Sequence, residues 1–383
     1  MSTSRIALFA LCLAACTTAP PLDATDAAAP PDALQVDGGM RVDGGPMSDA
    51  DTPPSGDPID AAADTWTWVD FPTSRCASGT PTGLAVNPHE GATELLIYLQ
   101  GGGECTTGEG CWGAMPAAVF LDGFGEAQFA AASGVTGSAI FDRDDERNPL
   151  REASQVFVPY CTGDLHAGRT EADLRTTDGT THHTYFWGAQ DLDIFLARLV
   201  PTFPNVTRIY LTGVSAGGFG TILSYDVVAR SFGVRVDAVD DSGPPILAPR
   251  ATRNGSLAVW GFAPPAGCAG DCDTYRAVYD VARAMQPSSR FGFLLYAYDT
   301  TISDRYNFAT PADYTAAIDM FSESLASDAN AATFIVDDSA CDPVSHRCHV
   351  VQNDDAAEEA TLAWITQMWT SDPAWHSTRL PIP

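Results

Sequence analysis

The chain has 383 residues, of which 45% are hydrophobic and 18% are charged, a composition typical of a globular protein with a sizeable buried core. It carries 49 acidic and 20 basic residues, and its formal net charge is -29. Such an acidic chain repels phosphate groups and anionic lipid surfaces, so the composition excludes nucleic acid as a partner.

The first 16 residues have the pattern of an export signal. One early Arg precedes an apolar stretch that is too short to span a membrane in the mature protein. Residues 13–16 (Leu-Ala-Ala-Cys) resemble a bacterial lipobox, which predicts cleavage before Cys16 and a lipid anchor on its sulfur. An ordinary signal peptide is the alternative. The predicted location is therefore the bacterial cell envelope, with Thr17 favouring the outer membrane, or a secreted form.

Residues 17–64 consist mainly of Asp, Ala, Pro and Gly and lack the apolar clusters that a core requires. Their repeated negative charge favours an extended chain, so we predict a disordered acidic tether. Aromatic and apolar residues begin at Trp66 and continue to the C-terminus. Residues 65–383 are therefore predicted to form one domain, which we expect to be a monomer that touches the membrane only through its anchor.

Continuous apolar runs alternate with segments of helical periodicity through this domain. Apolar runs without polar alternation are typical of strands covered on both faces. We therefore predict an α/β fold with a mainly parallel central sheet flanked by helices, and an active site at the carboxyl ends of the strands. The predicted strands are 94–99, 155–160, 207–211, 236–239, 291–298 and 333–336, and the predicted helices are 187–200, 221–230, 273–285, 312–325 and 355–369.

Residues 213–217 (Gly-Val-Ser-Ala-Gly) join the predicted strand 207–211 to the predicted helix 221–230. A glycine on each side of the serine lets strand and helix approach closely while the serine adopts a strained conformation. This pattern raises the serine hydroxyl above the sheet edge. A glycine-rich loop is the alternative, but the flanking strand and helix favour Ser215 as a nucleophile.

Three consecutive glycines follow the predicted strand 94–99. Glycines expose their backbone N–H groups to a substrate, so we expect Gly102 and Gly103 to bind an oxyanion together with Ala216 at the helix start. A phosphate-binding loop is the alternative, but the Lys and Ser/Thr of that motif are absent.

An activated serine needs a base and a carboxylate that orients the base, and in this fold the acid lies between serine and histidine along the chain. Asp299 ends the predicted strand 291–298 and is the predicted acid, with Asp304 as its competitor. Asp240 and Asp241 also end a strand, and we interpret them as shaping the turn that follows.

Two histidines follow the last predicted strand, His346 and His349. If Cys341 and Cys348 form a disulfide, His349 lies just past it, where a rigid bridge would fix the ring. We predict His349 as the base and keep His346 as the alternative. A Cys/His zinc site is a further interpretation, but exported cysteines usually oxidise and the sequence offers no second ligand cluster, so we predict neither a metal nor a cofactor.

Eight cysteines remain when Cys12 leaves with the signal and Cys16 carries lipid. An even number in an exported domain predicts disulfides, although the sequence leaves their connectivity open. Spacing favours three close pairs, and elimination leaves the fourth. The expected bridges are Cys105 to Cys111, Cys268 to Cys272, Cys341 to Cys348 and Cys76 to Cys161.

Four motifs occur in a fixed order: residues 98–105 followed by Cys111-Trp112, residues 158–168, residues 213–218, and Tyr298-Asp299. Together they resemble the pectin acetylesterase family, which includes plant pectin acetylesterases and Notum-like carboxylesterases, over most of residues 70–370. The resemblance implies an α/β-hydrolase fold, a Ser-Asp-His triad and removal of acetyl or lipid acyl groups. Family members often carry a bulky aromatic residue where this chain has Gly103, so the shape of the acyl pocket does not carry over.

Four further residues fall in family-like stretches. Asp164 and His166 belong to the second motif, and we expect them to support the architecture of the site rather than to transfer protons. His182 and His183 either line the entrance to the site or lie in a surface loop.

The sequence thus leads us to expect an extracytoplasmic serine carboxylesterase. Its expected substrate is an acyl ester, with acetyl groups on a polysaccharide such as pectin as the family-based choice. The alternatives are a lipase, peptidase or protein deacylase on the same scaffold, or a catalytically silent glycan-binding surface lipoprotein.

Overall fold

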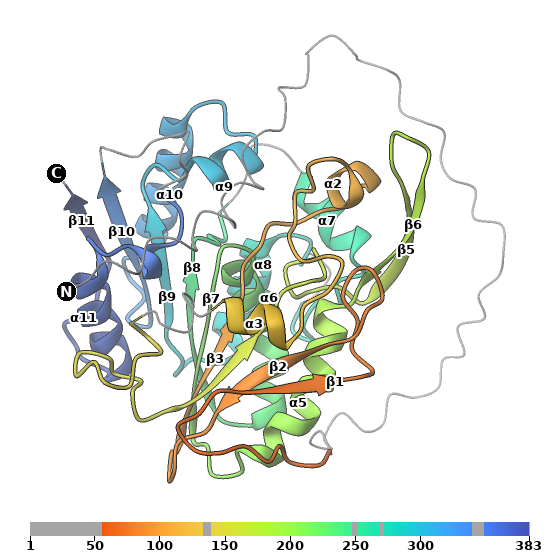
Figure 1. Cartoon of the computed structure of the whole chain (residues 1–383). Coiled ribbons are helices and arrows are strands. Elements are labelled where there is room, and N and C mark those ends of the chain that lie inside the picture. Colours follow the sequence, from red (N-terminus) through yellow and green to blue (C-terminus); the bar gives the residue numbers. More distant parts are fainter. Residues whose placement is uncertain (1–55, 133–138, 247–251, 269–271, 339–347, 383) are drawn as a thin grey trace, which may run out of the picture.

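The computed structural model describes residues 56–132, 139–246, 252–268, 272–338 and 348–382. The predicted signal peptide, Cys16 and most of the predicted tether lie outside these residues. Residues 56–64, the end of that tether, lie against the domain, where Ile59 is buried and its N–H donates to Thr202 Oγ1 (2.8 Å). The described chain forms a central sheet with helices on both faces (Figure 1), which confirms the predicted α/β architecture.

The central sheet contains nine strands over the described residues, in the order β1-β2-β4-β3-β7-β8-β9-β10-β11. Every neighbouring pair from β4 to β11 is parallel, whereas β1 and β2 add an antiparallel edge. All six predicted strands are present. The strands are β1 (Thr67–Phe71), β2 (Thr82–Asn87), β3 (Glu94–Leu99), β4 (Ser154–Val158), β7 (Arg208–Val214), β8 (Arg235–Asp241), β9 (Phe291–Tyr296), β10 (Ala331–Asp338) and β11 (Thr378–Ile382).

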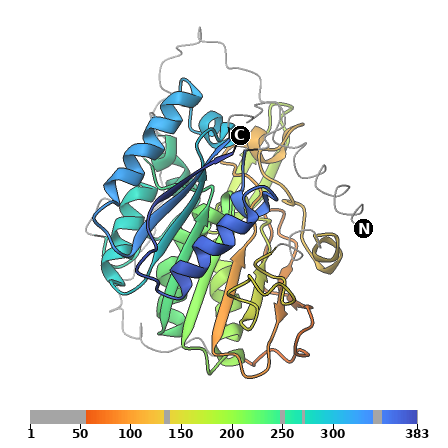
Figure 2. The same cartoon turned by 90° about the vertical axis from the view of Figure 1, so that its left-hand side faces the viewer.

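Helices pack on the sheet through two separate hydrophobic cores, one on each face. Alternate residues of a strand enter opposite cores: on β3, Leu95 and Ile97 join one core and Leu96 joins the other. Figure 2 shows α11 on one face with α5, α6 and α8 on the other. The helices are α2 (Gly108–Trp112), α3 (Glu126–Ala131), α5 (Gly188–Thr202), α6 (Ala216–Phe232), α7 (Thr252–Val259), α8 (Tyr275–Met285), α9 (Thr300–Arg305), α10 (Pro311–Ser324), α11 (Glu358–Trp369) and the 3₁₀ turn η2 (Val351–Asn353).

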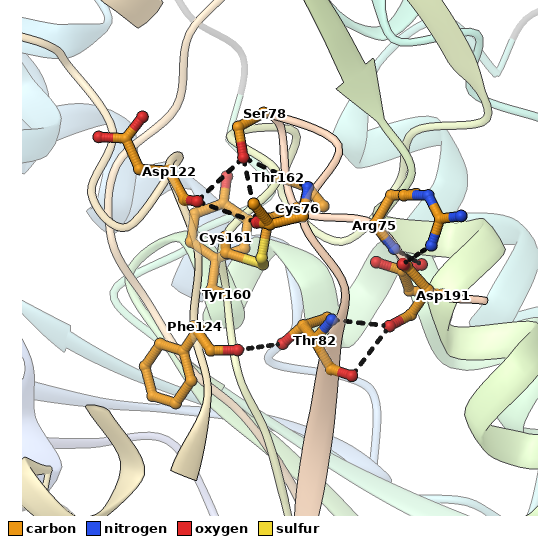
Figure 3. The surroundings of a disulfide bond; sticks show 12 residues. Arg75, Cys76, Ser78, Thr82, Asp122, Phe124, Tyr160, Cys161, Thr162 and Asp191 are labelled. Carbon is orange, nitrogen blue, oxygen red and sulfur yellow. Dashed lines mark hydrogen bonds between the residues drawn. A yellow bond between two sulfur atoms is a disulfide. The ribbon is translucent and has the colours of Figure 1, made fainter. Parts of the chain in front are cut away.

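Three of the four expected disulfides lie within the described residues. The bridge from Cys76 to Cys161 fixes the chain before β2 to the end of β4, and Figure 3 shows it beside the hydrogen bond from Thr82 Oγ1 to the Phe124 carbonyl (2.8 Å). The other two are the short bridges Cys105 to Cys111 and Cys268 to Cys272. Cys341 lies outside the described residues.

Several features of the fold differ from the sequence-based expectations, among them the strands β1, β2 and β11, which were not predicted. The helix α6 begins at Ala216, five residues before the predicted start, although Gly217, Gly218 and Gly220 are weak helix formers. The structure needs them there, because a Cβ atom on Gly217 would lie 2.0 Å from the Leu99 carbonyl oxygen. A hairpin of β5 (Thr170–Arg175) and β6 (Thr181–Phe186) was not predicted either, because its polar residues give no apolar run.

Candidate active site

Ser215 lies in the sharp turn between β7 and α6. Its backbone has φ 55° and ψ -118°, a region that non-glycine residues rarely adopt and that costs about 1 to 3 kcal/mol. A Cβ atom on Gly213 would lie 2.4 Å from the Gly217 carbonyl oxygen, so neither glycine can carry a side chain. The turn thus has the close strand-to-helix approach that the Gly-Val-Ser-Ala-Gly pattern predicts.

The structure brings Ser215, His349 and Asp299 into one chain of hydrogen bonds. His349 Nε2 lies 2.8 Å from Ser215 Oγ, and His349 Nδ1 lies 2.7 Å from Asp299 Oδ2. A carboxylate only accepts hydrogen bonds, so Nδ1 carries the proton and donates it to Asp299, while the Ser215 hydroxyl donates to Nε2. Ser215 directly follows β7 and Asp299 lies shortly after β9, as expected of a site at the carboxyl ends of a parallel sheet.

The surroundings of His349 favour its protonated form. Its side chain is 13% exposed, and that of Asp299 is fully buried. Burial alone would lower the pKa of His349, but the charge of Asp299, its hydrogen bond and the charge of Asp241 together raise this pKa above the ordinary histidine value. The imidazole is therefore a better proton acceptor than a free histidine.

Asp299 is held by the helix that follows it. It is the N-cap of α9, and its Oδ1 accepts the Ile302 N–H (3.0 Å), which leaves Oδ2 for His349. Asp304, the competing acid, lies exposed on α9. His346, the alternative base, lies outside the described residues.

The glycine loop packs closely against its neighbours. Gly102 and Gly103 have φ values of 156° and 79°, and a Cβ atom on Gly103 would lie 2.0 Å from the Ala117 carbonyl oxygen. A Cβ atom on Gly101 would lie 3.1 Å from the Cβ atom of Ser215. The predicted oxyanion-binding loop is thus a close neighbour of the serine, and neither Gly101 nor Gly103 can bear a side chain.

The buried side chain of His166 holds the residue that precedes the glycine loop. Its Nε2–H donates to the Gln100 carbonyl (2.9 Å), and its ring packs on Tyr160 with 4.8 Å between centroids. Burial lowers the pKa of His166 to about 4, so it stays neutral at ordinary pH. Asp164 is also buried and accepts the Gly188 N–H (2.7 Å) at the start of α5. Both residues have contacts that are typical of supporting roles.

A second link joins the glycine loop to α9. Glu104 Oε1 accepts from Arg305 Nε (2.8 Å), and Arg305 Nη2 donates to the Glu104 carbonyl (3.1 Å). The Glu104 side chain is only 10% exposed. Because α9 also carries Asp299 at its start, this ion pair connects the loop to the element that holds the carboxylate. Sequence reasoning missed the pair, since its members are 201 residues apart.

The remaining histidines of interest lie on the β5–β6 hairpin. His182 stacks on Trp112 at a centroid distance of 5.0 Å, and exposed His183 lies between Asp173 (2.7 Å) and Glu171 (3.0 Å). Both lie in the strand β6 of this hairpin and not in a loop, and whether they line the entrance to the site stays a prediction. In the part of the chain that the structure describes, no group of three or more His, Cys, Asp or Glu residues is arranged to hold a metal ion.

A family model described as pectinacetylesterase matches residues 65–257, half of the chain. The chain belongs to the pectinacetylesterase family. The matched region contains the glycine loop and Ser215, whereas Asp299 and His349 lie beyond its end. The assignment of those two residues therefore depends on the geometry of the site.

Curated relatives of this family member include the palmitoleoyl-protein carboxylesterase notum1' of Xenopus laevis, which is 27% identical over 179 residues. The palmitoleoyl-protein carboxylesterase NOTUM of Homo sapiens is 26% identical over 179 residues, and pectin acetylesterase 4 of Arabidopsis thaliana is 28% identical over 138 residues. These matches cover 44%, 44% and 36% of this chain and 34%, 34% and 31% of the relatives. The chain thus spans about a third of the length of the curated relatives it matches.

No helix among the described segments combines the length and the apolar character that crossing a bilayer requires.

Proposed function

We propose that this pectinacetylesterase family member is a serine carboxylesterase with Ser215 as nucleophile, His349 as base and Asp299 as the orienting acid. The observation that carries the proposal is the position of His349, whose two ring nitrogens lie 2.8 Å from Ser215 Oγ and 2.7 Å from Asp299 Oδ2. An imidazole held between a hydroxyl and a buried carboxylate is the arrangement that activates a serine for acyl transfer.

The proposed reaction has two halves. Ser215 Oγ attacks the ester carbonyl while His349 Nε2 takes the hydroxyl proton, and Asp299 stabilises the resulting imidazolium. The N–H groups of Gly102, Gly103 and Ala216 bind the developing oxyanion. His349 then gives its proton to the departing alcohol. Water repeats the sequence on the acyl-enzyme and releases the acid, so no metal or organic cofactor takes part.

The proposed substrate is a short acyl ester, with acetyl groups on a polysaccharide such as pectin as the first choice. The pectinacetylesterase family model and the similarity to pectin acetylesterase 4 of Arabidopsis thaliana support this choice. Removal of a lipid acyl group from a protein is the second candidate, favoured by the similarity to palmitoleoyl-protein carboxylesterases.

We further propose that the enzyme acts outside the cytoplasm. The N-terminal sequence supports export and a lipid anchor at Cys16, and residues 17–55 would tether the domain to the envelope. The disulfides within the domain are consistent with an oxidising compartment.

A series of p-nitrophenyl esters from acetyl to palmitoyl, assayed on residues 56–383 and on the full chain, tests the proposal. We expect kcat/KM to be highest for acetyl or butyryl esters, whereas a maximum at long chains would favour the deacylase. The Ser215→Ala variant serves as the control, and we expect its kcat to fall on the order of 10⁵-fold. Undiminished turnover by a folded Ser215→Ala variant would refute the assignment. If the wild type is active, acetate release from acetylated glycans identifies its natural substrate.

A further inference from the structure

Asp241, the last residue of β8, contacts the nucleophile turn through its backbone. Its carbonyl oxygen accepts the Ser215 N–H at 2.7 Å. The same carbonyl excludes a side chain in the first turn of α6, because a Cβ atom on Gly218 would lie 2.4 Å from it. The peptide that carries Ser215 is therefore fixed directly to the end of β8.

The side chain of Asp241 binds the segment that carries the histidine. Its Oδ1 accepts the Val351 N–H (2.9 Å) and its Oδ2 accepts the Gln352 N–H (2.8 Å). The neighbouring Ser242 hydroxyl donates to Asp241 Oδ1 (2.9 Å) and accepts the Val350 N–H (3.0 Å). Three consecutive amides, all directly after His349, are thus bound by two adjacent side chains.

The backbone at this point needs such support. Val350 has φ 72° and ψ 94°, and a positive φ is a genuine outlier for a β-branched residue. Ser242 also has a positive φ, 62°, and is fully buried. Strained residues persist where surrounding contacts fix them, and hydrogen bonds from amides to a buried carboxylate are among the stronger ones.

Asp241 also acts on His349 through its charge. The carboxylate is fully buried, and it adds to Asp299 in raising the pKa of His349. Burial raises the pKa of Asp241 itself to about 6, against the opposing effect of its hydrogen bonds, so it is charged at neutral pH. The other titratable groups that face it are Asp240, Tyr98, Tyr210 and Tyr296, and burial raises the pKa of each.

We propose that Asp241, assisted by Ser242, is a positioning residue that joins the nucleophile turn to the histidine segment and thereby sets the imidazole of His349 against Ser215. The inference rests on the proposed function for its kinetic readout, but its structural readout does not require turnover. Asp299 remains the proposed acid and His349 the proposed base, because Asp241 is fully buried and acts through the backbone at 350–352.

The decisive variant is Asp241→Asn, whose amide nitrogen cannot accept a hydrogen bond, so the Val351 or the Gln352 N–H loses its acceptor. We expect kcat for p-nitrophenyl acetate to fall about 100-fold with KM little changed, as for a displaced catalytic group. Loss of the nearby negative charge also lowers the pKa of His349, so the acidic limb of the kcat/KM profile moves to lower pH.

Two further variants separate position from charge. Ser242→Ala keeps the carboxylate but loses the acceptor for Val350 N–H, and we expect a fall in kcat of about tenfold without a shift of the acidic limb. Asp240→Asn is the matched control, since its Oδ1 can still accept the Gly243 N–H (2.8 Å), and it should stay within about threefold of the wild type.

An NMR titration of the His349 ring provides the readout that is independent of activity. We expect Asp241→Asn to lower the pKa of His349 and to weaken the downfield signal of its Nδ1 proton.

If the wild type is active but Asp241→Asn keeps its kcat, the acidic limb of its pH profile and its ring signals, the inference is overturned and the esterase proposal stands. If the wild type hydrolyses no ester, the esterase fails and the titration alone decides on Asp241. Should Asp241→Asn not fold, full activity and unchanged ring signals of Ser242→Ala overturn the inference.

Discussion

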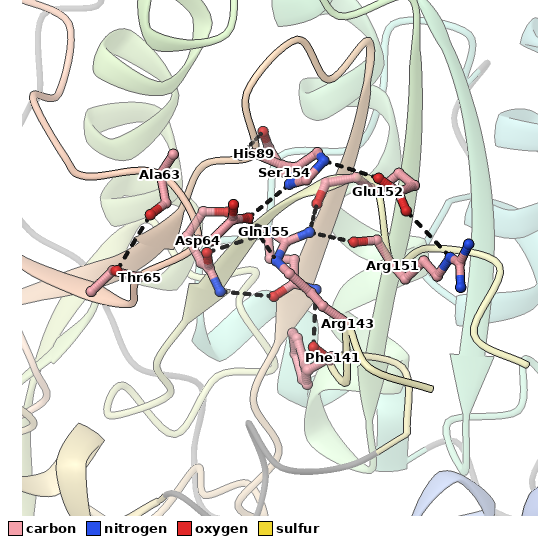
Figure 4. A network of polar contacts seen from close by, with 12 residues as sticks. Ala63, Asp64, Thr65, His89, Phe141, Arg143, Arg151, Glu152, Ser154 and Gln155 are labelled. Atoms are coloured by element: carbon pink, nitrogen blue, oxygen red, sulfur yellow. Dashed lines mark hydrogen bonds and ion pairs between the residues drawn. The ribbon is translucent and has the colours of Figure 1, made fainter. Parts of the chain in front are cut away.

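Two histidine–aspartate pairs at opposite ends of the strands have the same distance between Nδ1 and the carboxylate. His349 Nδ1 lies 2.7 Å from Asp299 at the carboxyl ends of the strands, and His89 Nδ1 lies 2.7 Å from Asp64 near the start of β3 (Figure 4). They differ in burial: the aspartate side chain is fully buried in the first pair and 51% exposed in the second. The distance between imidazole and carboxylate therefore does not identify an active site.

The partner of the second ring nitrogen is what separates the pairs. Nε2 of His349 lies 2.8 Å from the hydroxyl of Ser215, whereas Nε2 of His89 lies 3.0 Å from the carboxylate of Glu152. A ring between a carboxylate and a hydroxyl can take a proton from the hydroxyl and return it. Carboxylates only accept hydrogen bonds, so neither carboxylate contact of the His89 ring offers a proton for it to take.

The largest expected difference between the pairs concerns catalysis. We expect His349→Ala to lower kcat for p-nitrophenyl acetate on the order of 10⁴-fold or more, because the serine loses its base. The kcat of His89→Ala should stay within about twofold of the wild-type value, since the contacts of His89 lie at the opposite end of the strands from Ser215. Steady-state kinetics on both variants, with circular dichroism to confirm folding, measure the contrast. Similar losses of kcat in the two variants would contradict this prediction.

The two aspartates should differ nearly as much. Asp299→Asn keeps the shape but removes the acceptor that orients the Nδ1 proton, so we expect kcat to fall about 10³ to 10⁴-fold. Asp64→Asn should leave kcat unchanged and lower the free energy of unfolding by less than about 1 kcal/mol, because half-exposed ion pairs contribute little. Steady-state kinetics give kcat and denaturant unfolding gives the free energy of unfolding for both variants. An Asp299→Asn enzyme with wild-type kcat would argue against Asp299 as the acid.

The smallest effect is a shift in the pH profile. Only the neutral form of His349 accepts a proton, and its pKa is raised, so kcat/KM should fall as pH drops through a midpoint above the ordinary value of 6.5. Exposed His183 also has a raised pKa, because it forms hydrogen bonds to Asp173 and Glu171. His183→Ala should nevertheless leave this pH profile unchanged. A midpoint at or below 6.5, or one that moves in His183→Ala, would contradict this account.

Local signals in the sequence were sufficient for the six predicted strands, which correspond to β3, β4, β7, β8, β9 and β10, and for the nucleophile turn. The apolar run of β3 has the predicted bounds, 94–99, and the glycines around Ser215 predict the close approach that the structure contains. The antiparallel strands β1 and β2 were missed, because β1 mixes polar residues with apolar ones and gives no continuous apolar run.

Contacts between distant segments could not be read from the sequence. We interpreted Asp241 as a turn residue, although its carboxylate binds an amide 110 residues away at Val351. Glu104 and Arg305 likewise meet across 201 residues. Such pairings depend on strand order, which single-sequence patterns do not contain. An Asp-Ser pair at the end of the strand next to the nucleophile strand is the signal that could have indicated the role of Asp241 and Ser242.

Covalent labelling with a fluorophosphonate probe tests the proposed role of Ser215 most directly. Peptide mass spectrometry should find one phosphonyl adduct, on Ser215, in the folded wild-type protein. The adduct should be strongly reduced in His349→Ala, where the serine lacks its base, and absent in Ser215→Ala. A folded wild-type protein that takes no label, or a Ser215→Ala variant that is labelled as fully as the wild type, would contradict the assignment.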